Sequence, residues 1–333
     1  MQSAGPDEVA GHGIALCRLR PARCLGFDVT ERGASQLRRV WETDRVSWKL
    51  PRLWIVASAM AVAVFLASVS PALAQEAPIC KKRDKTYSGK NDKIKLGPGR
   101  QRVNGGDGND VIRGGPGNDI LNGGRGNDRV YGGPGKDVVC GGLGNDKLYG
   151  DKGNDRLFGE EQDDKLYGGR GNDYMLGSAG LDKLFGWGRK KGEFVDDGID
   201  FLDGSFEDDV LQAGGRDTLK GGSGEDVLRT KTKDIAPKKM DGGLDDDKLI
   251  GSNAADRIFG DLGDDLIQGN AGDDTIHGEE ANDSIFGGLG NDLLYGDDGA
   301  DFLSGDEDED RCDGGKGNDD KADKSCERTI GVP

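Results

Sequence analysis

The chain has 333 residues, of which 59 are glycine, and its 62 acidic residues outnumber the 45 basic ones, for a net charge of −17. Because 48 of the acids are aspartate, the composition favours turns over surface helices and argues against an ordinary enzyme with one thick core. Collagen is excluded because glycine does not recur at every third position, and the acidic surface argues against non-specific nucleic-acid binding.

The N-terminal part has the order of features of a secretory signal. Basic residues precede an almost wholly apolar run at 53–70, and the small-x-small sequence Ala-Leu-Ala follows at 72–74. Cleavage there would leave a secreted chain that begins at Gln75 and no longer contacts a membrane. A retained membrane anchor is the alternative, since the run approaches the ~20 residues of a spanning helix. Residues 1–45 are long for the start of a signal, and one hypothesis is that translation begins near Val46.

From residue 87 onward the sequence repeats every nine residues, as in GGDGNDVIR at 105–113 and GGPGNDILN at 114–122. We count 25 units: 14 nonapeptides from 87 to 212 without insertion, an eight-residue unit and one nonapeptide to 229, and nine more at 242–322. Position six of the unit is aspartate in 23 units, and position eight is apolar in 23. A fixed period of this kind is the signature of a stacked repeat architecture.

These features predict seven segments. They are 1–45, an N-terminal extension; 46–74, a signal peptide; 75–104, an N-terminal cap with degenerate repeats; 105–185, a first repeat block; 186–241, irregular repeats and a basic insert; 242–322, a second repeat block; and 323–333, a C-terminal cap or tail.

The chemistry of one unit predicts its structure. The glycine-rich half adopts positive φ at low cost and forms a tight turn, and the last three residues form a short strand with the position-eight side chain pointing inward. One unit cannot bury that side chain alone, so units must stack. We expect an all-β fold, a parallel β-roll (β-solenoid) of about 25 units with two short strands per coil and an irregular centre. Stacked aspartates would repel one another, and a hard divalent cation with oxygen ligands, calcium above all, would neutralise them.

The repeated G-G-x-G-x-D-x-U-x pattern resembles the RTX (hemolysin-type) calcium-binding nonapeptide repeats over about residues 87–322. The resemblance implies a parallel β-roll that binds multiple Ca²⁺ ions between successive turns, through position-six carboxylates and turn carbonyls. The implied ligand candidates in the first and last runs of repeats are Asp110, Asp119, Asp128, Asp137, Asp146, Asp155, Asp164, Asp173, Asp182, Asp247, Asp256, Asp265, Asp274, Asp283, Asp292, Asp301 and Asp310. Weaker candidates, because several of their turns lack glycines, are Asp200, Asp209, Asp217 and Asp226.

The pattern breaks in three places. The unit at 186–194 keeps its length but has Lys191 at position six and Glu193 at position eight, so we expect a bulged turn without metal. The basic insert at 230–241 is expected to loop out into solvent, a partner-binding role being the alternative. The unit at 159–167 lacks the turn glycines, which makes the site of Asp164 doubtful.

The secreted form would keep four cysteines, which allow three pairings. We favour Cys80–Cys140 and Cys312–Cys326, because each would staple one end of the repeat array and repeat proteins need end caps. Free or intermolecular thiols are the alternative.

No catalytic motif accompanies the repeats. The sequence contains two histidines, neither within a His-Glu-x-x-His motif, and no Gly-x-Ser-x-Gly or P-loop motif, so we expect no enzymatic activity. We therefore expect a secreted, extracellular calcium-binding protein that folds on binding the ion. One alternative is a calcium-dependent adhesin or surface-matrix component with a cell-surface partner. The other is an enzyme with a site hidden in 186–241.

Overall fold

The computed structural model describes residues 80, 86–87, 89–187, 198–230, 234, 236, 238–317, 319–326 and 328–331. The expected N-terminal extension and signal peptide lie outside the described residues. All described residues belong to one unit, Pro71–Pro333. Among them, no helix has both the length and the apolar character needed to cross a bilayer.

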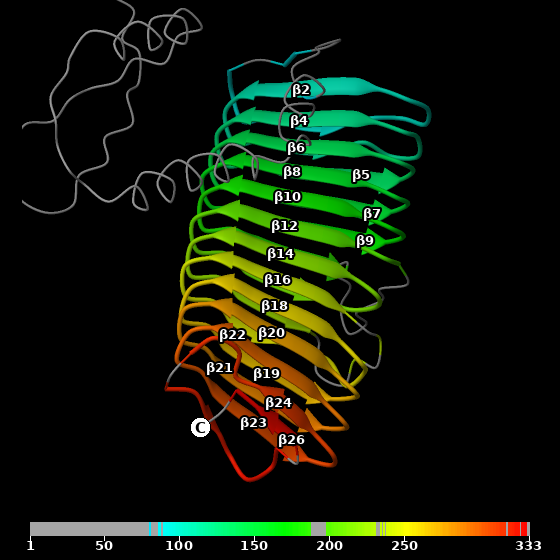
Figure 1. The fold of residues 1–333 in the computed structure, drawn as a ribbon. Coiled ribbons are helices and arrows are strands. Elements are labelled where there is room, and N and C mark those ends of the chain that lie inside the picture. The colour runs from blue at the N-terminus through cyan, green and yellow to red at the C-terminus, as the bar shows by residue number, and fades with distance from the viewer. Residues whose placement is uncertain are drawn as a thin grey trace, which may run out of the picture. The chain divides into compact units, whose positions relative to one another are not determined.

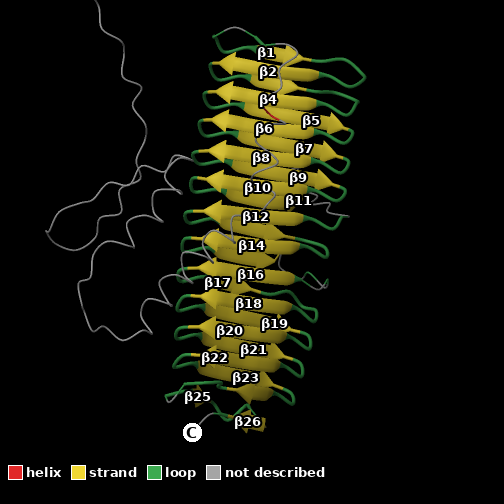
Figure 2. Cartoon of the chain, turned by 45° about the horizontal axis from the view of Figure 1, so that its top comes forward, coloured by secondary structure: helices red, strands yellow, loops and turns green. Residues whose placement is uncertain are grey.

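The described residues form two sheets of 13 parallel strands each, and the chain alternates between the sheets at every strand (Figures 1 and 2). The odd sheet contains β1 Lys93–Lys95, β3 Val111–Arg113, β5 Arg129–Pro134, β7 Lys147–Lys152, β9 Lys165–Arg170, β11 Lys183–Trp187, β13 Val210–Ala213, β15 Val227–Thr230, β17 Lys248–Ile250, β19 Leu266–Ala271, β21 Ser284–Leu289, β23 Phe302–Glu307 and β25 Lys321–Ala322. The even sheet contains β2 Arg102–Asp107, β4 Ile120–Arg125, β6 Val138–Leu143, β8 Arg156–Glu161, β10 Tyr174–Ala179, β12 Phe201–Phe206, β14 Thr218–Ser223, β16 Lys239–Leu244, β18 Arg257–Leu262, β20 Thr275–Glu280, β22 Leu293–Asp298, β24 Arg311–Asp313 and β26 Arg328–Ile330.

The core is a single row of position-eight side chains from each sheet. Leu121 of β4 and Val130 of β5 are fully buried, and the same position is buried along the whole stack to Cys312. One strand from each sheet makes a coil, so partners in a sheet lie two repeat units apart along the chain, as Leu121 and Val139 do. The prediction of an all-β parallel β-roll with two short strands per coil is confirmed.

The nine-residue phase counted through 186–194 is kept in the strand pairing, but the ladder contains one unit fewer here than the sequence count. Tyr174 pairs with Phe201, which lies three units further along the chain rather than two, so one nonapeptide does not join the ladder. The physical reason is that this unit, with Lys191 and Glu193, offers neither an aspartate for the turn nor an apolar side chain for the core. The bulged turn expected there falls on residues 188–197, which lie outside the described residues.

The prediction that the 230–241 insert loops out is wrong for its last residues, since Lys239–Asp241 begin β16 and Thr218 pairs with Lys239. Residues 231–233, 235 and 237 of the insert lie outside the described residues. Met240 is fully buried in the core row, and β16 continues into the glycines that open the next turn. A buried side chain at the correct phase therefore outweighs the basic composition of the segment.

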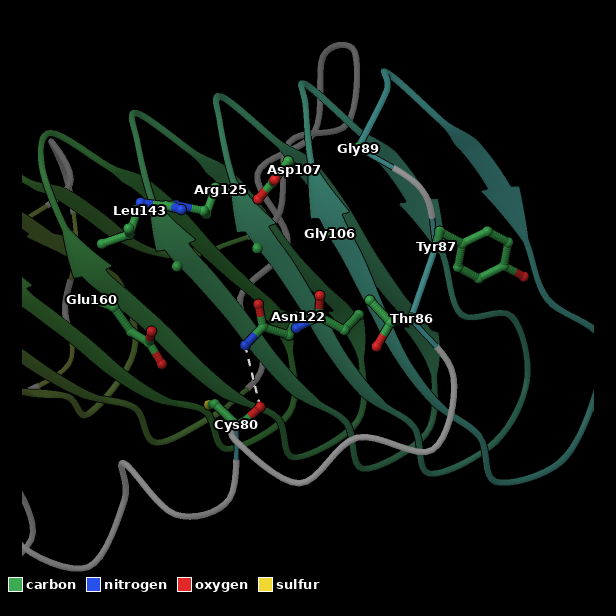
Figure 3. Close-up of a pocket in the computed structure, with 13 residues that line it drawn as sticks. Cys80, Thr86, Tyr87, Gly89, Gly106, Asp107, Asn122, Arg125, Leu143 and Glu160 are labelled. Carbon is green, nitrogen blue, oxygen red and sulfur yellow. Dashed lines mark hydrogen bonds between the residues drawn. The ribbon is translucent and has the colours of Figure 1, made fainter. Parts of the chain in front are cut away.

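Each end of the stack carries a disulfide. Cys80 is bonded to Cys140, 60 residues away, and Cys312 to Cys326, 14 residues away. Figure 3 shows Cys80 beside Asn122 of β4, whose side-chain amide donates to the carbonyl of Cys80 at 3.2 Å. These cross-links join the terminal segments to coils that already pair with their neighbours.

Candidate metal sites

The turns before the strands hold two columns of position-six residues. Asp110, which precedes β3, is 1% exposed, and Asp119, which precedes β4, is 1% exposed. The odd column consists of Asp92, Asp110, Asp128, Asp146, Asp164, Asp182, Asp209, Asp226, Asp247, Asp265, Asp283, Asp301 and Asp320. The even column consists of Gln101, Asp119, Asp137, Asp155, Asp173, Asp200, Asp217, Lys238, Asp256, Asp274, Asp292 and Asp310.

Each column is linked by one repeated hydrogen bond. The backbone N–H of Asp110 donates to Oδ1 of Asp128 at 2.6 Å, and that of Asp128 donates to Oδ1 of Asp146 at 2.6 Å. The N–H of Asp119 makes the same bond to Asp137 at 2.7 Å in the even column. One carboxylate oxygen of each aspartate is therefore used to connect successive coils.

The second carboxylate oxygen is different. The columns contain 22 buried aspartates, and 20 of them, all except Asp217 and Asp256, have a buried Oδ2 with no hydrogen-bond partner. A buried, unpaired carboxylate oxygen is strongly unfavourable unless a cation or proton satisfies it. These orphaned oxygens recur at regular intervals along both edges of the fold.

Glycine at position one keeps space beside most of the orphaned oxygens. A Cβ added at Gly114 would lie 2.6 Å from Oδ2 of Asp119 and 2.5 Å from the carbonyl oxygen of Gly132, one coil further along. A side chain here would fill the space onto which a carboxylate and a carbonyl from successive turns converge. In the same turns, Gly126 has φ of +123°, which L residues rarely adopt.

Burial shifts the proton equilibria of the columns. The pKa of Asp155 is raised to about 8 and that of Asp164 to about 9, mainly by burial and in part by neighbouring carboxylates, while backbone hydrogen bonds lower both. The same causes raise the pKa of Asp247 to about 9. Without a counter-charge, the folded columns therefore favour protonated carboxyls near neutral pH.

The donor set fits calcium. Calcium takes about six to eight oxygen ligands in flexible geometry, and these turns offer carboxylate and backbone carbonyl oxygens from two successive coils. Among the described residues, the groups of three close His, Cys, Asp or Glu side chains do not include the column aspartates, so turn carbonyls would complete each site. A bound calcium would supply the positive charge that the orphaned oxygens lack.

The structure places all 21 predicted ligand aspartates in the columns, buried and in phase. The weaker candidates have the same placement as the others. In the doubtful turn at 159–164, Glu160 and Gln162 adopt φ of 82° and 71° in place of glycine, and Asp164 has the orphaned oxygen. Loss of the glycines therefore does not remove the turn geometry.

Sequence analysis missed two column residues. In the last unit, Asp320 rather than Asp319 is buried, because Ala322 pairs with Leu303 and this coil is one residue longer than most. The D-x-U spacing would have shown this, since Asp320 precedes the apolar Ala322 by two residues. The same rule would have placed Lys238, two residues before Met240 and nine before Asp247, at position six.

Two other features lie outside the columns. His277 stacks on Tyr295 with ring centroids 4.5 Å apart, and its Nδ1 is 2.9 Å from Oδ2 of Asp297. A hollow of about 420 Å³ lies beside Cys80 and is lined by residues including Asn122 and Glu160 (Figure 3). No column aspartate lines that hollow.

Comparison with known proteins bears on the columns. A family model described as RTX calcium-binding nonapeptide repeat (4 copies) matches residues 96–130, 113–148, 149–184, 194–228, 240–267, 259–294 and 286–320. Among solved structures, the chain is similar to a hyperactive, Ca²⁺-dependent, β-helical antifreeze protein from an Antarctic bacterium, with 18% identity, a TM-score of 0.38, and coverage of 74% of this chain and 83% of that chain. No curated protein matches the sequence.

Proposed function

This chain belongs to the RTX calcium-binding nonapeptide-repeat family, and from that premise we propose that it is a secreted protein whose β-roll folds when extracellular calcium binds between its stacked turns. The observation that carries the proposal is the repeated orphaned Oδ2 of the column aspartates. The residues proposed as ligands are the 20 aspartates with that orphaned oxygen, together with carbonyls of the adjoining turns.

Coupling between calcium binding and folding follows from the charges. At neutral pH and low calcium the unfolded chain keeps its aspartates hydrated and ionised, whereas the folded columns bury them within contact of one another's backbone. Calcium that binds only the folded chain contributes its binding free energy to folding. Extracellular calcium modules bind at dissociation constants of about 10⁻⁴–10⁻³ M, so such a chain would stay unfolded in the cytosol and fold outside the cell.

Secretion is supported by two features. The apolar run and Ala-Leu-Ala site precede the repeats, and the two disulfides fit an oxidising compartment. The repulsion among the column aspartates would also delay folding until the chain meets calcium outside the cell, which is compatible with export in an unfolded state.

The test is a calcium titration of the secreted chain, from Gln75 with both disulfides intact, followed by circular dichroism. We expect strand signal to appear cooperatively at millimolar calcium and to change little with magnesium, which demands stricter octahedral geometry. After signal removal Trp187 is the only tryptophan. It is 7% exposed at the end of β11, so its fluorescence reports folding locally. A chain that is equally strand-rich in chelator would overturn the proposal.

A further inference from the structure

One column residue is a cation. Lys238 lies at position six of the even column: its backbone N–H donates to Oδ1 of Asp256 at 2.6 Å, and its carbonyl accepts from the N–H of Arg257 at 3.0 Å. The aspartates of the column make the same two backbone connections. The side chain of Lys238 is nevertheless 0% exposed. A fully buried lysine is rare and requires partners for its charge.

The ammonium of Lys238 has a complete set of partners. It donates to Oδ2 of Asp234 at 2.9 Å, to the carbonyl of Ala236 at 2.8 Å and to the carbonyl of Gly215. Gly215 belongs to the turn one coil earlier, so the ammonium joins two successive turns of the column. Its three N–H donors are matched by three oxygen acceptors, one of them anionic. The cation thus bridges turn carbonyls and a carboxylate between coils.

The two aspartates that flank Lys238 in the column differ from all the others. The Oδ2 of Asp217 accepts from the N–H of Gly214 at 3.0 Å, and that of Asp256 accepts from the N–H of Ser252 at 2.5 Å. Ser252 Oγ also donates to Oδ1 of Asp256 at 3.0 Å. These are the two buried column aspartates without an orphaned oxygen. The coils around the lysine therefore satisfy their own carboxylates.

The local sequence departs from the repeat in the ways that this arrangement needs. The unit containing Asp217 is one residue short, which brings Gly214 to within three residues of that aspartate. The unit containing Asp256 has Ser252 at the position where the motif has its second glycine, and Ser252 is 2% exposed. The Ser252 hydroxyl is also 3.0 Å from the carbonyl oxygen of Ala236, in the turn of the lysine, which is an alternative acceptor to Asp256 for its single proton. The side chains of Lys238 and Ser252 thus contact the neighbouring turns, so the three successive turns before β14, β16 and β18 are linked without an orphaned carboxylate oxygen.

We propose that Lys238 is a resident cation that takes the place of calcium at this level of the even column, so that the column is divided into two calcium arrays separated by calcium-independent coils. The proposal rests on the proposed function, since it assigns calcium to the other levels. One array includes Asp119, Asp137 and Asp155, and the other includes Asp274 and Asp292. The odd column runs past this level without interruption.

The other described column position without aspartate follows the same logic. Gln101 begins the even column, and its Nε2 donates to the carbonyls of Gly97 at 3.0 Å and Pro98 at 3.3 Å. An N–H donor again faces turn carbonyls where the carboxylate is missing. Lys238 adds to this a full positive charge and a contact to the preceding coil.

The experiment measures calcium stoichiometry and stability of the full chain and of Lys238→Met, which keeps the length of the side chain but removes its charge. We expect Lys238→Met to bind as many calcium ions as the wild type and to raise the unfolding equilibrium constant by about a hundredfold, the effect of breaking a buried ion pair. That factor should be the same at every calcium concentration that supports folding, because no ion binds at the altered level.

Two comparison variants sharpen the result. Asp274→Asn, which alters an aspartate with an orphaned oxygen in the same column, should lose stability increasingly as calcium rises. Lys248→Met removes the same charge from an exposed strand position and should match the wild type in both measurements. If the effect of Lys238→Met grows with calcium concentration, or if its stoichiometry changes, the lysine does not replace the ion.

A third variant tests the substitution directly. Lys238→Asp restores the repeat motif, and we expect it to bind at least one calcium ion more than the wild type, with a larger calcium dependence of stability. A folded Lys238→Asp chain with unchanged stoichiometry would overturn the inference but leave the proposed function intact. A wild-type chain that binds no calcium would overturn both.

Discussion

The backbone N–H of Asp137 donates to Oδ1 of Asp155, one coil further along the even column, at an N···O distance of 2.8 Å. Both side chains are 1% exposed, and the Oδ2 of Asp155 has no hydrogen-bond partner. A single carboxylate therefore holds two coils in register with one oxygen and presents the other to whatever cation lies between the turns. The relationship repeats along both columns, so most of these carboxylates link two coils through one oxygen and keep a second, buried oxygen without a hydrogen-bond partner.

Replacing Asp155 by asparagine separates these two roles. The amide keeps an acceptor for the N–H of Asp137 but replaces the anionic Oδ2 with an NH₂ group that cannot bind calcium. In calcium we expect Asp155→Asn to bind at least one ion fewer and to lose about 1–3 kcal/mol of unfolding free energy. In chelator we expect no loss, because one buried charge has been removed. Urea unfolding followed by circular dichroism, in both conditions, measures the difference.

The matched control is Asp308→Asn. Asp308 is exposed and has φ of 85°, a conformation that asparagine tolerates, so the same charge is removed without touching a column. It should leave calcium stoichiometry unchanged. Equal effects of Asp155→Asn in calcium and in chelator would mean that its role is packing alone.

Glycine at position one can be tested by a single methyl group. In Gly114→Ala the new Cβ would lie 2.6 Å from Oδ2 of Asp119, within the space proposed for the ion. We expect calcium affinity at that level to fall by about tenfold or more, which corresponds to about 1.4 kcal/mol. Isothermal titration calorimetry measures the change.

Gly97→Ala is the control for that substitution. A Cβ at Gly97 has no heavy atom within 4 Å, so alanine there should leave calcium binding unaltered. If the two variants bind calcium alike, the position-one glycines do not border the metal sites.

The dependence of folding on pH should change sign with calcium. The ordinary aspartate pKa is 3.8. Burial raises the pKa of Asp128 to about 7 and that of Asp274 to about 8. The folded, metal-free chain therefore binds more protons than the unfolded chain. The contribution of these carboxyls to the free energy of unfolding is fully present at pH values below their pKa in the unfolded chain. It is lost as pH rises through their pKa values in the folded chain. In chelator we expect more strand signal at about pH 5 than at about pH 8.

With saturating calcium the order should reverse, because protons compete with the ion for the same carboxylate oxygens. Circular dichroism across the pH range, with and without chelator, tests both halves of this prediction. Strand content that rises with pH in chelator would show that the column carboxylates do not control folding.

The terminal disulfides should act locally. Serine in place of Cys312 and Cys326 opens a link between residues 14 apart, which we expect to cost about 3 kcal/mol. Because each coil contacts only its neighbours, the loss of amide protection should be confined to β23–β26. Hydrogen exchange in saturating calcium measures this, and the Cys80/Cys140 double serine variant should loosen only the N-terminal coils. Uniform loss of protection in either variant would contradict a capping role.

The column aspartates and the core row could be predicted from the sequence because they depend on short-range rules. The turn, the strand and the D-x-U spacing all lie within nine residues. The buried positions of Asp110 and Ile112 can therefore be predicted from their own repeat unit. The same rules made the site of Asp164 doubtful because its turn lacks glycines, but Glu160 and Gln162 adopt positive φ there when neighbouring coils hold them.

The sequence by itself determined the period, the all-β roll, the two columns of carboxylates and the need for a cation, since each follows from nine residues and their charges. Only the tertiary structure decided which units join the ladder between 186 and 241 and that the ammonium of Lys238 meets the carbonyl of Gly215. These outcomes depend on pairing between successive coils, whose spacing along the chain varies in this region. A unit is retained or omitted there according to whether its side chains complete the core and turn of the coils on either side, which no single repeat contains.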